Sequence, residues 1–337
     1  MSLLPYLRCV AAGTDLSAEE AHQSMAVLLE GGAGEAEIAG FLVALKMKGE
    51  TAVEIAGFAR ALRDHMIVVD AGPDVIDTCG TGGDGSGTFN ISTVAAIVMA
   101  GAGAHVAKHG NRSISGSTGS ADVLEALGVR VTLTPEESAR AIREIGIGFL
   151  FAPLLHPAMK QVQAVRRALK IRTVFNLLGP LANPARAQSQ LLGAPSPDAA
   201  KRMAEALAVL GTRRSFVVHG QDGLDEISIT APTDVYEVTG QTVAKHVWKA
   251  SNFGLEEAPE SSLKGGDPAC NAQIIKSILS GSRGPQRDIV VANAAAGLFA
   301  AGLADGLLPG VASASRSLDS GAALRKLELL QENFPVA

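Results

Sequence analysis

A glycine-rich segment contains the residue types that point most directly to chemistry in this sequence. It reads CGTGGDGSGTFNIST over residues 79–93, after a short apolar run and before a small-residue stretch typical of a helix. Glycines let backbone N–H groups approach a phosphate closely, and the N-terminal end of a following helix adds partial positive charge. The segment therefore predicts a phosphate-binding loop, although glycine content alone also fits a flexible turn. It matches neither a P-loop nor a clean GxGxxG dinucleotide turn.

A second candidate anion site follows in the segment KHGNRSISGSTGS, residues 108–120. Lys108, His109 and Arg112 share this segment with several hydroxyl groups and glycines. Apolar residues on both flanks place it at the end of a strand, which is where open α/β sheets bind ligands. The charges alone would also fit a basic surface loop. Two loops of this kind indicate a ligand that carries two phosphate groups.

Adjacent carboxylates form the third chemical feature. Asp225 and Glu226 lie in HGQDGLDEISI, directly after the strand-like run SFVVH. Oxygen ligands of this kind suit Mg²⁺, which commonly takes one or two carboxylates together with substrate phosphates. An isolated Asp-Glu pair is more often a solvated surface feature. The glycine-bearing neighbours of this pair, at a strand end, favour a metal site.

The pattern of elements explains how these segments come together. The first 65 or so residues read as helices, with capping boxes at Ser17 and Thr51. After Asp70, strand-like and helix-like stretches alternate, which predicts a largely parallel or mixed sheet covered by helices. The predicted strands include residues 105–110, 129–133, 149–153 and 215–220. The stretch 156–185 is predicted as a helix followed by a proline-rich loop, and residues 289–302 as an apolar closing helix.

Composition limits the classes of function. The length of 337 residues predicts two domains, and 47% hydrophobic with 19% charged residues fits an α/β enzyme. A net charge of −5 provides no global basic field, so neither nucleic acid nor a membrane is expected as a partner. The three cysteines form no CxxC pair, and the N-terminus makes a weak case for a signal peptide. We therefore expect a cytoplasmic protein.

Four runs together resemble the anthranilate phosphoribosyltransferase family over nearly the whole chain. They are CGTGGDGSGTFNIST, AKHGNRSISGSTGSADVLEALG, HPAMKQVQAVRRALKIRTVFNLLGPLANP and HGQDGLDE. KHGNR, FNLLGPLANP and DGLDE in this order are similar to that family and differ from the related pyrimidine nucleoside phosphorylases, which carry KHS in the basic loop. A phosphorylase-like enzyme and a non-catalytic paralogue that binds phosphosugar or nucleic acid are the alternatives.

The resemblance implies an α/β fold class with a small N-terminal helical domain. That domain covers residues 1–70, joined by part of 160–180, and the larger domain covers 71–337 around a mostly parallel or mixed sheet flanked by helices. The family moves ribose 5-phosphate from phosphoribosyl pyrophosphate (PRPP) to the amine of anthranilate and releases pyrophosphate. This is the second step of tryptophan biosynthesis from chorismate. The likeness further implies Mg²⁺, with two ions expected, and a homodimer.

The resemblance also assigns residues. For PRPP these are Gly80, Gly83, Asp84, Thr88, Asn90, Ser92, Thr93, Lys108, Asn111, Arg112, Ser113, Ser115, Gly116 and Ser120. For anthranilate they are Gly80, Asn111 and Arg166, and for the metal Ser92, Asp225 and Glu226. No general base is expected because the aromatic amine is already a neutral nucleophile, and His109 is the candidate if one is needed.

Four positions depart from the family pattern, two in the loop of residues 108–120 and two in the predicted helix of the 156–185 stretch. The usual SSxSG or SSxCG reads here with Gly116 in place of one serine and Thr118 in place of another, which puts one hydroxyl contact in doubt. Ala164 replaces a usual proline and Lys170 a usual glycine. An arginine at position 166 suits a carboxylate because its planar fork binds both oxygens, although without the resemblance it would fit a solvent-facing side chain equally well.

Overall fold

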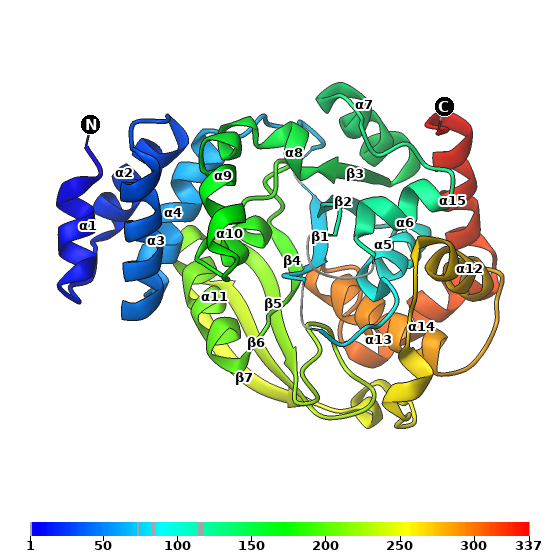
Figure 1. Cartoon of the computed structure of the whole chain (residues 1–337). Coiled ribbons are helices and arrows are strands. Elements are labelled where there is room, and N and C mark those ends of the chain that lie inside the picture. The colour runs from blue at the N-terminus through cyan, green and yellow to red at the C-terminus, as the bar shows by residue number, and fades with distance from the viewer. Residues whose placement is uncertain (1, 73, 83–84, 114–117, 337) are drawn as a thin grey trace.

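A bundle of four helices forms the N-terminal part of the computed structural model, which describes residues 2–72, 74–82, 85–113 and 118–336 (Figure 1). The helices are α1 (Leu4–Ala11), α2 (Ala18–Leu29), α3 (Glu35–Lys48) and α4 (Ala52–Asp64). Capping boxes start α2 at Ser17 and α4 at Thr51, as the sequence predicts. Each cap satisfies backbone N–H groups that the first turn of a helix leaves unpaired.

A seven-stranded mixed sheet forms the centre of the larger part. Its strands are β1 (Val75–Gly80), β2 (His105–Gly110), β3 (Ile147–Phe151), β4 (Ser189–Gly193), β5 (Thr212–Gly220), β6 (Thr233–Gly240) and β7 (Thr242–Trp248). They lie in the order β3-β2-β1-β4-β5-β6-β7. The first five run parallel, and β6 and β7 continue the sheet antiparallel. The predicted α/β class and mixed sheet are therefore confirmed.

Helices cover both faces of this sheet. The helices that follow the bundle in the chain are α5 (Ile91–Gly101), α6 (Ser120–Ala126), α7 (Pro135–Arg140), α8 (Ala152–Leu155), α9 (Lys160–Leu169), α10 (Phe175–Leu181), α11 (Pro197–Leu210), α12 (Pro268–Leu279), α13 (Pro285–Ala300), α14 (Leu307–Asp319) and α15 (Ala322–Asn333). Successive side chains of a strand point to opposite faces. Accordingly, Phe216 and Val218 of β5 pack in the core around α5 and α13, whereas Val217 packs in the core that α11 shares with the helical bundle.

Several expectations about elements were wrong. Residues 129–133 form no strand: Val129 makes only an isolated bridge to Pro335, and the alternating valines of this stretch are buried as extended chain. The proline-rich loop contains α10, and β4 follows it without having been predicted. The apolar helix α13 does not close the chain, because α14 and α15 come after it.

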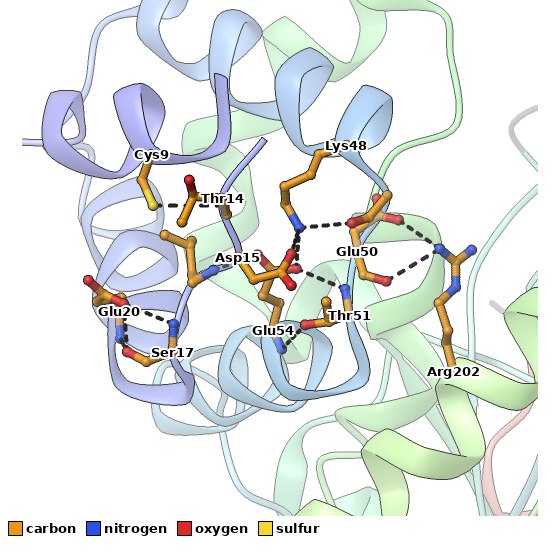
Figure 2. A network of polar contacts seen from close by, with 12 residues as sticks. Cys9, Thr14, Asp15, Ser17, Glu20, Lys48, Glu50, Thr51, Glu54 and Arg202 are labelled. Atoms are coloured by element: carbon orange, nitrogen blue, oxygen red, sulfur yellow. Dashed lines mark hydrogen bonds and ion pairs between the residues drawn. The ribbon is translucent and has the colours of Figure 1, made fainter. Parts of the chain in front are cut away.

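The helical bundle is attached to the larger part through α9 and α11. Helix α9 packs on α2 and α3, and α11 packs on α4. Figure 2 shows the polar network at this junction, in which Lys48 donates to Asp15 at 2.6 Å and to the buried Glu54 at 2.9 Å. Glu50 beside it faces Arg202 of α11, with the carboxylate 3.6 Å from the guanidinium. No helix among the described residues is long and apolar enough to cross a membrane.

Candidate active site

Glycines end four neighbouring parallel strands at one edge of the sheet. They are Gly110 of β2, Gly80 of β1, Gly193 of β4 and Gly220 of β5. The carboxyl ends of parallel strands form the crevice in which open α/β sheets bind ligands. A Cβ at Gly80 would lie 2.5 Å from Asp225 Oδ2, and one at Gly193 would overlap the Asp225 carbonyl. The Asp225 segment lies directly across these strand ends, so glycine is required at position 193, where an added carbon would meet backbone, and a Cβ at position 80 would displace the Asp225 carboxylate.

The carboxylate pair lies against the glycine-rich segment of residues 79–93, called the glycine loop from here on, at this edge of the sheet. Asp225 and Glu226 are buried, with 7% and 8% of their surface exposed. Gly82 N donates to Asp225 Oδ2 at 2.8 Å, and Thr81 Oγ1 lies 3.4 Å from the same oxygen. Ser92 N, in the first turn of α5, donates to Glu226 Oε1 at 3.1 Å. The structure thus brings together two segments that are more than one hundred residues apart in the chain.

Two side chains, Asn293 of α13 and Asp222 within the motif itself, hold the β5–β6 loop in shape. Asn293 of α13 is fully buried; its Oδ1 accepts from Ile227 N at 3.0 Å and its Nδ2 donates to Ile227 O at 2.9 Å. Asp222 accepts hydrogen bonds from Ser228 Oγ and Thr230 Oγ1. The peptide next to Glu226 is therefore fixed by a bidentate amide contact that no local sequence pattern indicates.

Lys108 lies beneath the glycine loop at the centre of the site. Its Nζ donates to Thr78 O at 2.8 Å and to Ser92 Oγ at 3.3 Å. Burial lowers the pKa of Lys108, and negative neighbours that include Asp77 and Glu226 oppose that shift. Burial likewise raises the pKa of Asp77 to about 6, although Asn183 Nδ2 donates to its Oδ2 at 2.8 Å. Lys108 therefore places a buried cation beside Ser92, whose backbone N–H binds Glu226. A cation near the two carboxylates suits a ligand that carries both phosphate and metal.

The structure describes the basic loop, which is the segment of residues 108–120, on either side of residues 114–117. Ser120 Oγ donates to Asn111 O at 3.3 Å, which closes the loop onto the start of α6. Arg112 pairs with Glu125, at 2.5 and 2.7 Å, and with Asp122 at 3.2 Å. These carboxylates raise the pKa of Arg112 and direct its guanidinium along α6. The predicted Gly83, Asp84, Ser115 and Gly116 lie outside the described residues.

The predicted acceptor arginine lies on α9. The guanidinium of Arg166 lies 5.0 Å from the centre of the Phe175 ring, and burial lowers its pKa. Its neighbour Arg167 is exposed, so the two arginines face different directions, as residues one apart on a helix must. Lys170 ends the helix in a left-handed conformation with φ of 51°. Two positions on, Arg172 Nη2 donates to Gly82 O at 2.6 Å, a contact that the sequence did not predict.

Two buried histidines form a pair, His109 in β2 and His156 at the C-terminal end of α8, with ring centres 5.0 Å apart. His109 Nδ1 lies 3.1 Å from Gly179 O, so it carries the proton and donates. Burial lowers the pKa of His109 to about 3 and that of His156 to about 4. His109 Nε2 has no hydrogen-bond partner among the described residues. Both rings are therefore neutral at pH 7, with ring nitrogens facing the interior.

The donor set at the carboxylate pair fits Mg²⁺. Asp225, Glu226 and the Ser92 hydroxyl provide hard oxygen atoms, the class of ligand that this ion prefers. Among the described residues no group of three or more His, Cys, Asp or Glu side chains has the arrangement of a metal cage. Such a set leaves coordination positions for phosphate oxygens and water, which is the usual way Mg²⁺ is held in phosphate-transfer sites.

Comparisons with known proteins cover nearly the whole chain. Residues 4–66 match the family model described as "Glycosyl transferase family, helical bundle domain", and residues 72–324 match "Glycosyl transferase family, a/b domain". The anthranilate phosphoribosyltransferase of Solibacter usitatus is 56% identical over 335 residues, 98% of each protein. The crystal structure of the Thermus thermophilus enzyme superposes with a TM-score of 0.92 at 44% identity, covering 97% of this chain and 98% of that one. The Saccharomyces cerevisiae enzyme in complex with PRPP and Mg gives 0.90 at 31%, covering 98% and 97%.

Proposed function

This chain belongs to the anthranilate phosphoribosyltransferase family, and we propose that it transfers the phosphoribosyl group of PRPP to the amine of anthranilate, with release of pyrophosphate. The observation that carries the proposal is the meeting of Asp225 and Glu226 with the glycine loop and α5 at the carboxyl edge of the sheet. Carboxylates placed against a phosphate-binding loop suit a substrate that arrives as a magnesium complex.

We assign PRPP to the glycine loop and the basic loop together. Backbone N–H groups near Gly80 and at the N-terminus of α5 suit phosphate oxygens, as does the buried Nζ of Lys108. The hydroxyl groups of Thr88, Ser92 and Thr93, with Asn90, line the same stretch and complete the assignment on this side. Asn111, Ser113 and Ser120 are assigned on the other side. Arg112 is the weakest member of the set because Glu125 and Asp122 already bind its guanidinium.

Asp225, Glu226 and Ser92 are assigned to magnesium, with two ions proposed. When bound, Mg²⁺ would stabilise the negative charge that builds up on the departing pyrophosphate. The chain's own contribution is to fix these ligands: Gly82 N and Ser92 N orient the two carboxylates, and Asn293 fixes the peptide that follows them. Binding both substrates in a defined orientation lowers the entropic part of the barrier.

Anthranilate is assigned to the region of Arg166, Asn111 and Gly80, where Arg166 would bind the carboxylate. No residue is needed to activate the amine, since an aromatic amine is neutral at pH 7. The buried environment of His109 supports this view, because an imidazole whose pKa is lowered to about 3 is a poor proton acceptor at pH 7.

A homodimer is proposed from the outer face of the helical bundle. A groove of about 650 Å³ between α1 and α3 is lined by apolar side chains, among them Val10, Val43 and Met47. Met47 is 83% exposed, and burial of this side chain would favour contact with a second copy of the chain at this groove. The division into residues 1–70 and 71–337, with 160–180 joining the helical domain, is supported by the packing of α9 on α2 and α3. The free cysteines Cys9, Cys79 and Cys270 suit a cytoplasmic location.

An acceptor panel tests the proposal. Purified protein is incubated with PRPP and Mg²⁺, and loss of anthranilate fluorescence is compared with conversion of other aromatic amines and of nucleobases. The proposal predicts magnesium-dependent loss with anthranilate as the preferred acceptor. Phosphorolysis of a pyrimidine nucleoside, or binding of PRPP without turnover of any acceptor, would support one of the two alternatives instead.

A further inference from the structure

A closed ring of four hydrogen bonds joins the glycine loop, the basic loop and the segment that precedes α12. Asn90 Nδ2 donates to Thr118 O at 3.1 Å, and Thr118 Oγ1 donates to Gly266 O at 2.8 Å. Gly266 N donates to Asn271 Oδ1 at 2.7 Å, and Asn271 Nδ2 donates back to Asn90 Oδ1 at 3.1 Å. Both ends of each carboxamide are engaged, so the ring fixes the orientation of both amide groups.

Backbone pairing fixes the segment before α12 on the glycine loop. Gly265 N donates to Gly87 O at 2.9 Å, and Thr88 and Lys264 form an antiparallel bridge. A Cβ at Gly265 would lie 2.6 Å from Phe89 N, so this close approach requires glycine at position 265. The segment is therefore a firm support from which the ring reaches the basic loop through Thr118.

Helix α12 connects the same three segments a second time. Its N-cap, Asp267, accepts from Cys270 N at 2.8 Å, and Asn271 one residue later is 1% exposed. The helix packs on α5 and on α6. Since α5 directly follows the glycine loop and α6 directly follows the basic loop, α12 is in contact with the element behind each loop.

We infer that Thr118 and Asn271 are positioning residues that set the separation of the two phosphate-binding loops. The inference rests on the proposed function, because PRPP is the ligand that would occupy both loops at once. Thr118 occupies a position where the family pattern has serine or cysteine, and its hydroxyl binds the carbonyl of Gly266. Its role is to hold one loop to the other through the protein rather than to contact the substrate.

The separation of the loops matters because the 5-phosphate and the pyrophosphate of PRPP belong to one molecule. When one group is bound, the effective concentration of the other at its loop depends on how well the loop spacing matches the ligand. Loosening the ring leaves each loop with its own phosphate contacts. A ligand that spans both loops then loses affinity, whereas a ligand that occupies only one loop keeps its affinity.

Thr118→Val tests this inference, because valine keeps the shape of threonine and removes the hydroxyl. Calorimetry in the presence of Mg²⁺ gives the Kd of PRPP, of pyrophosphate and of ribose 5-phosphate for each protein. We expect PRPP to bind about tenfold more weakly, while the affinities of the two fragments stay within about twofold of the wild-type values. Thr118→Ser, which keeps the hydroxyl, is expected to restore PRPP binding. Thr132→Val is the matched control, since Thr132 is exposed.

Asn271→Asp is the second variant and answers the same question if Thr118→Val lowers the melting temperature strongly. The carboxylate cannot donate to Asn90 Oδ1, so the ring opens at another bond. Because both residues belong to one ring, the variant that carries both changes is expected to bind PRPP as tightly as whichever single variant has the lower PRPP affinity. Unchanged PRPP affinity, or an equal loss for PRPP and pyrophosphate, would overturn the inference. A wild-type protein that does not bind PRPP would instead refute the proposed function on which the inference rests.

Discussion

Replacing Gly80 with alanine tests whether the end of β1 sets the position of the Asp225 carboxylate. The added methyl carbon would lie 2.5 Å from Oδ2, 2.7 Å from Cγ and 2.9 Å from Oδ1 of that residue. An ordinary separation of nonbonded heavy atoms is roughly 3.5 Å. The carboxylate must therefore move by about 1 Å, half the length of a Mg²⁺–oxygen bond of about 2.0 to 2.1 Å.

A shift of this size is expected to affect turnover more than folding. Misplacement of a catalytic or ligand group by about 1 Å can lower a rate by a factor of about 100. The effect on folding is smaller because a side-chain carboxylate can rotate away from the added methyl group. We expect the free energy of unfolding to fall by about 1 to 3 kcal/mol. Gly193→Ala provides the contrast, since the added carbon there would overlap the backbone carbonyl of Asp225, which cannot rotate away.

The assay measures initial rates of anthranilate consumption as a function of Mg²⁺ concentration, alongside the melting temperature. Gly80→Ala should raise the magnesium concentration needed for half-maximal rate and lower kcat/KM by about 100-fold. Gly34→Ala is the matched control, because an added methyl group at Gly34 would meet no atom within 4 Å. A Gly80→Ala enzyme with wild-type rate and wild-type magnesium dependence would refute the view that Asp225 holds the ion in the position described.

Three further outcomes are expected. The double variant Asp225→Asn with Glu226→Gln keeps side-chain shape and should lose orders of magnitude of activity that added Mg²⁺ does not restore; near-normal turnover would contradict the metal assignment. Arg166→Ala should weaken acceptor binding by roughly 10- to 150-fold while PRPP affinity stays close to wild type; damage from Arg167→Ala instead would shift the acceptor site by one residue. Folding lowers the pKa of both paired histidines from 6.5 to about 3 and about 4, so these two imidazoles gain protons only in the unfolded chain as the pH falls below 6.5. Stability should therefore decrease from pH 7 to pH 5, because the two histidines outweigh the opposite and smaller effect of Asp77, whose pKa folding raises from 3.8 to about 6. Asn in place of His156 should flatten that dependence of the melting temperature, and an unchanged slope would show that these imidazoles are protonated in the folded protein.

Local patterns were sufficient to predict the features of the site that lie within single loops. The glycine run of 79–93, the basic segment after β2 and the Asp225–Glu226 pair each follow a strand, so their meeting at one edge of a parallel sheet follows from topology. The capping boxes at Ser17 and Thr51 were likewise readable, because a cap involves residues only three apart.

Contacts between distant segments could not be read in this way. Asn293 binds the backbone of Ile227 66 residues away, and Arg172 reaches Gly82 across 90 residues. Asn293 belongs to none of the motifs, and Arg172 lies in the run of residues 156–184 at a position to which the pattern assigns no role. A single arginine or asparagine is compatible with many environments. Only the folded chain shows which backbone groups lie beside them.

Some elements were misjudged for a related reason. Alternating valines made residues 129–133 resemble a strand, yet an alternating burial pattern also arises in extended chain that lacks a neighbour to pair with. The prolines around Phe175–Leu181 hid α10, because Pro180 lies inside this helix, at a position where proline lacks a backbone donor and normally indicates that a helix has ended. Strand β4 is only five residues long and fully buried, so it offered no alternation to detect.

The central claim is that this chain couples pyrophosphate release from PRPP to consumption of anthranilate. The most direct measurement is the stoichiometry of the reaction, with pyrophosphate and anthranilate quantified in the same sample at several times, with and without Mg²⁺. The account predicts one pyrophosphate released for each anthranilate consumed, and neither change when the metal is chelated. Pyrophosphate release without loss of anthranilate, or no reaction of either compound with magnesium present, would contradict it.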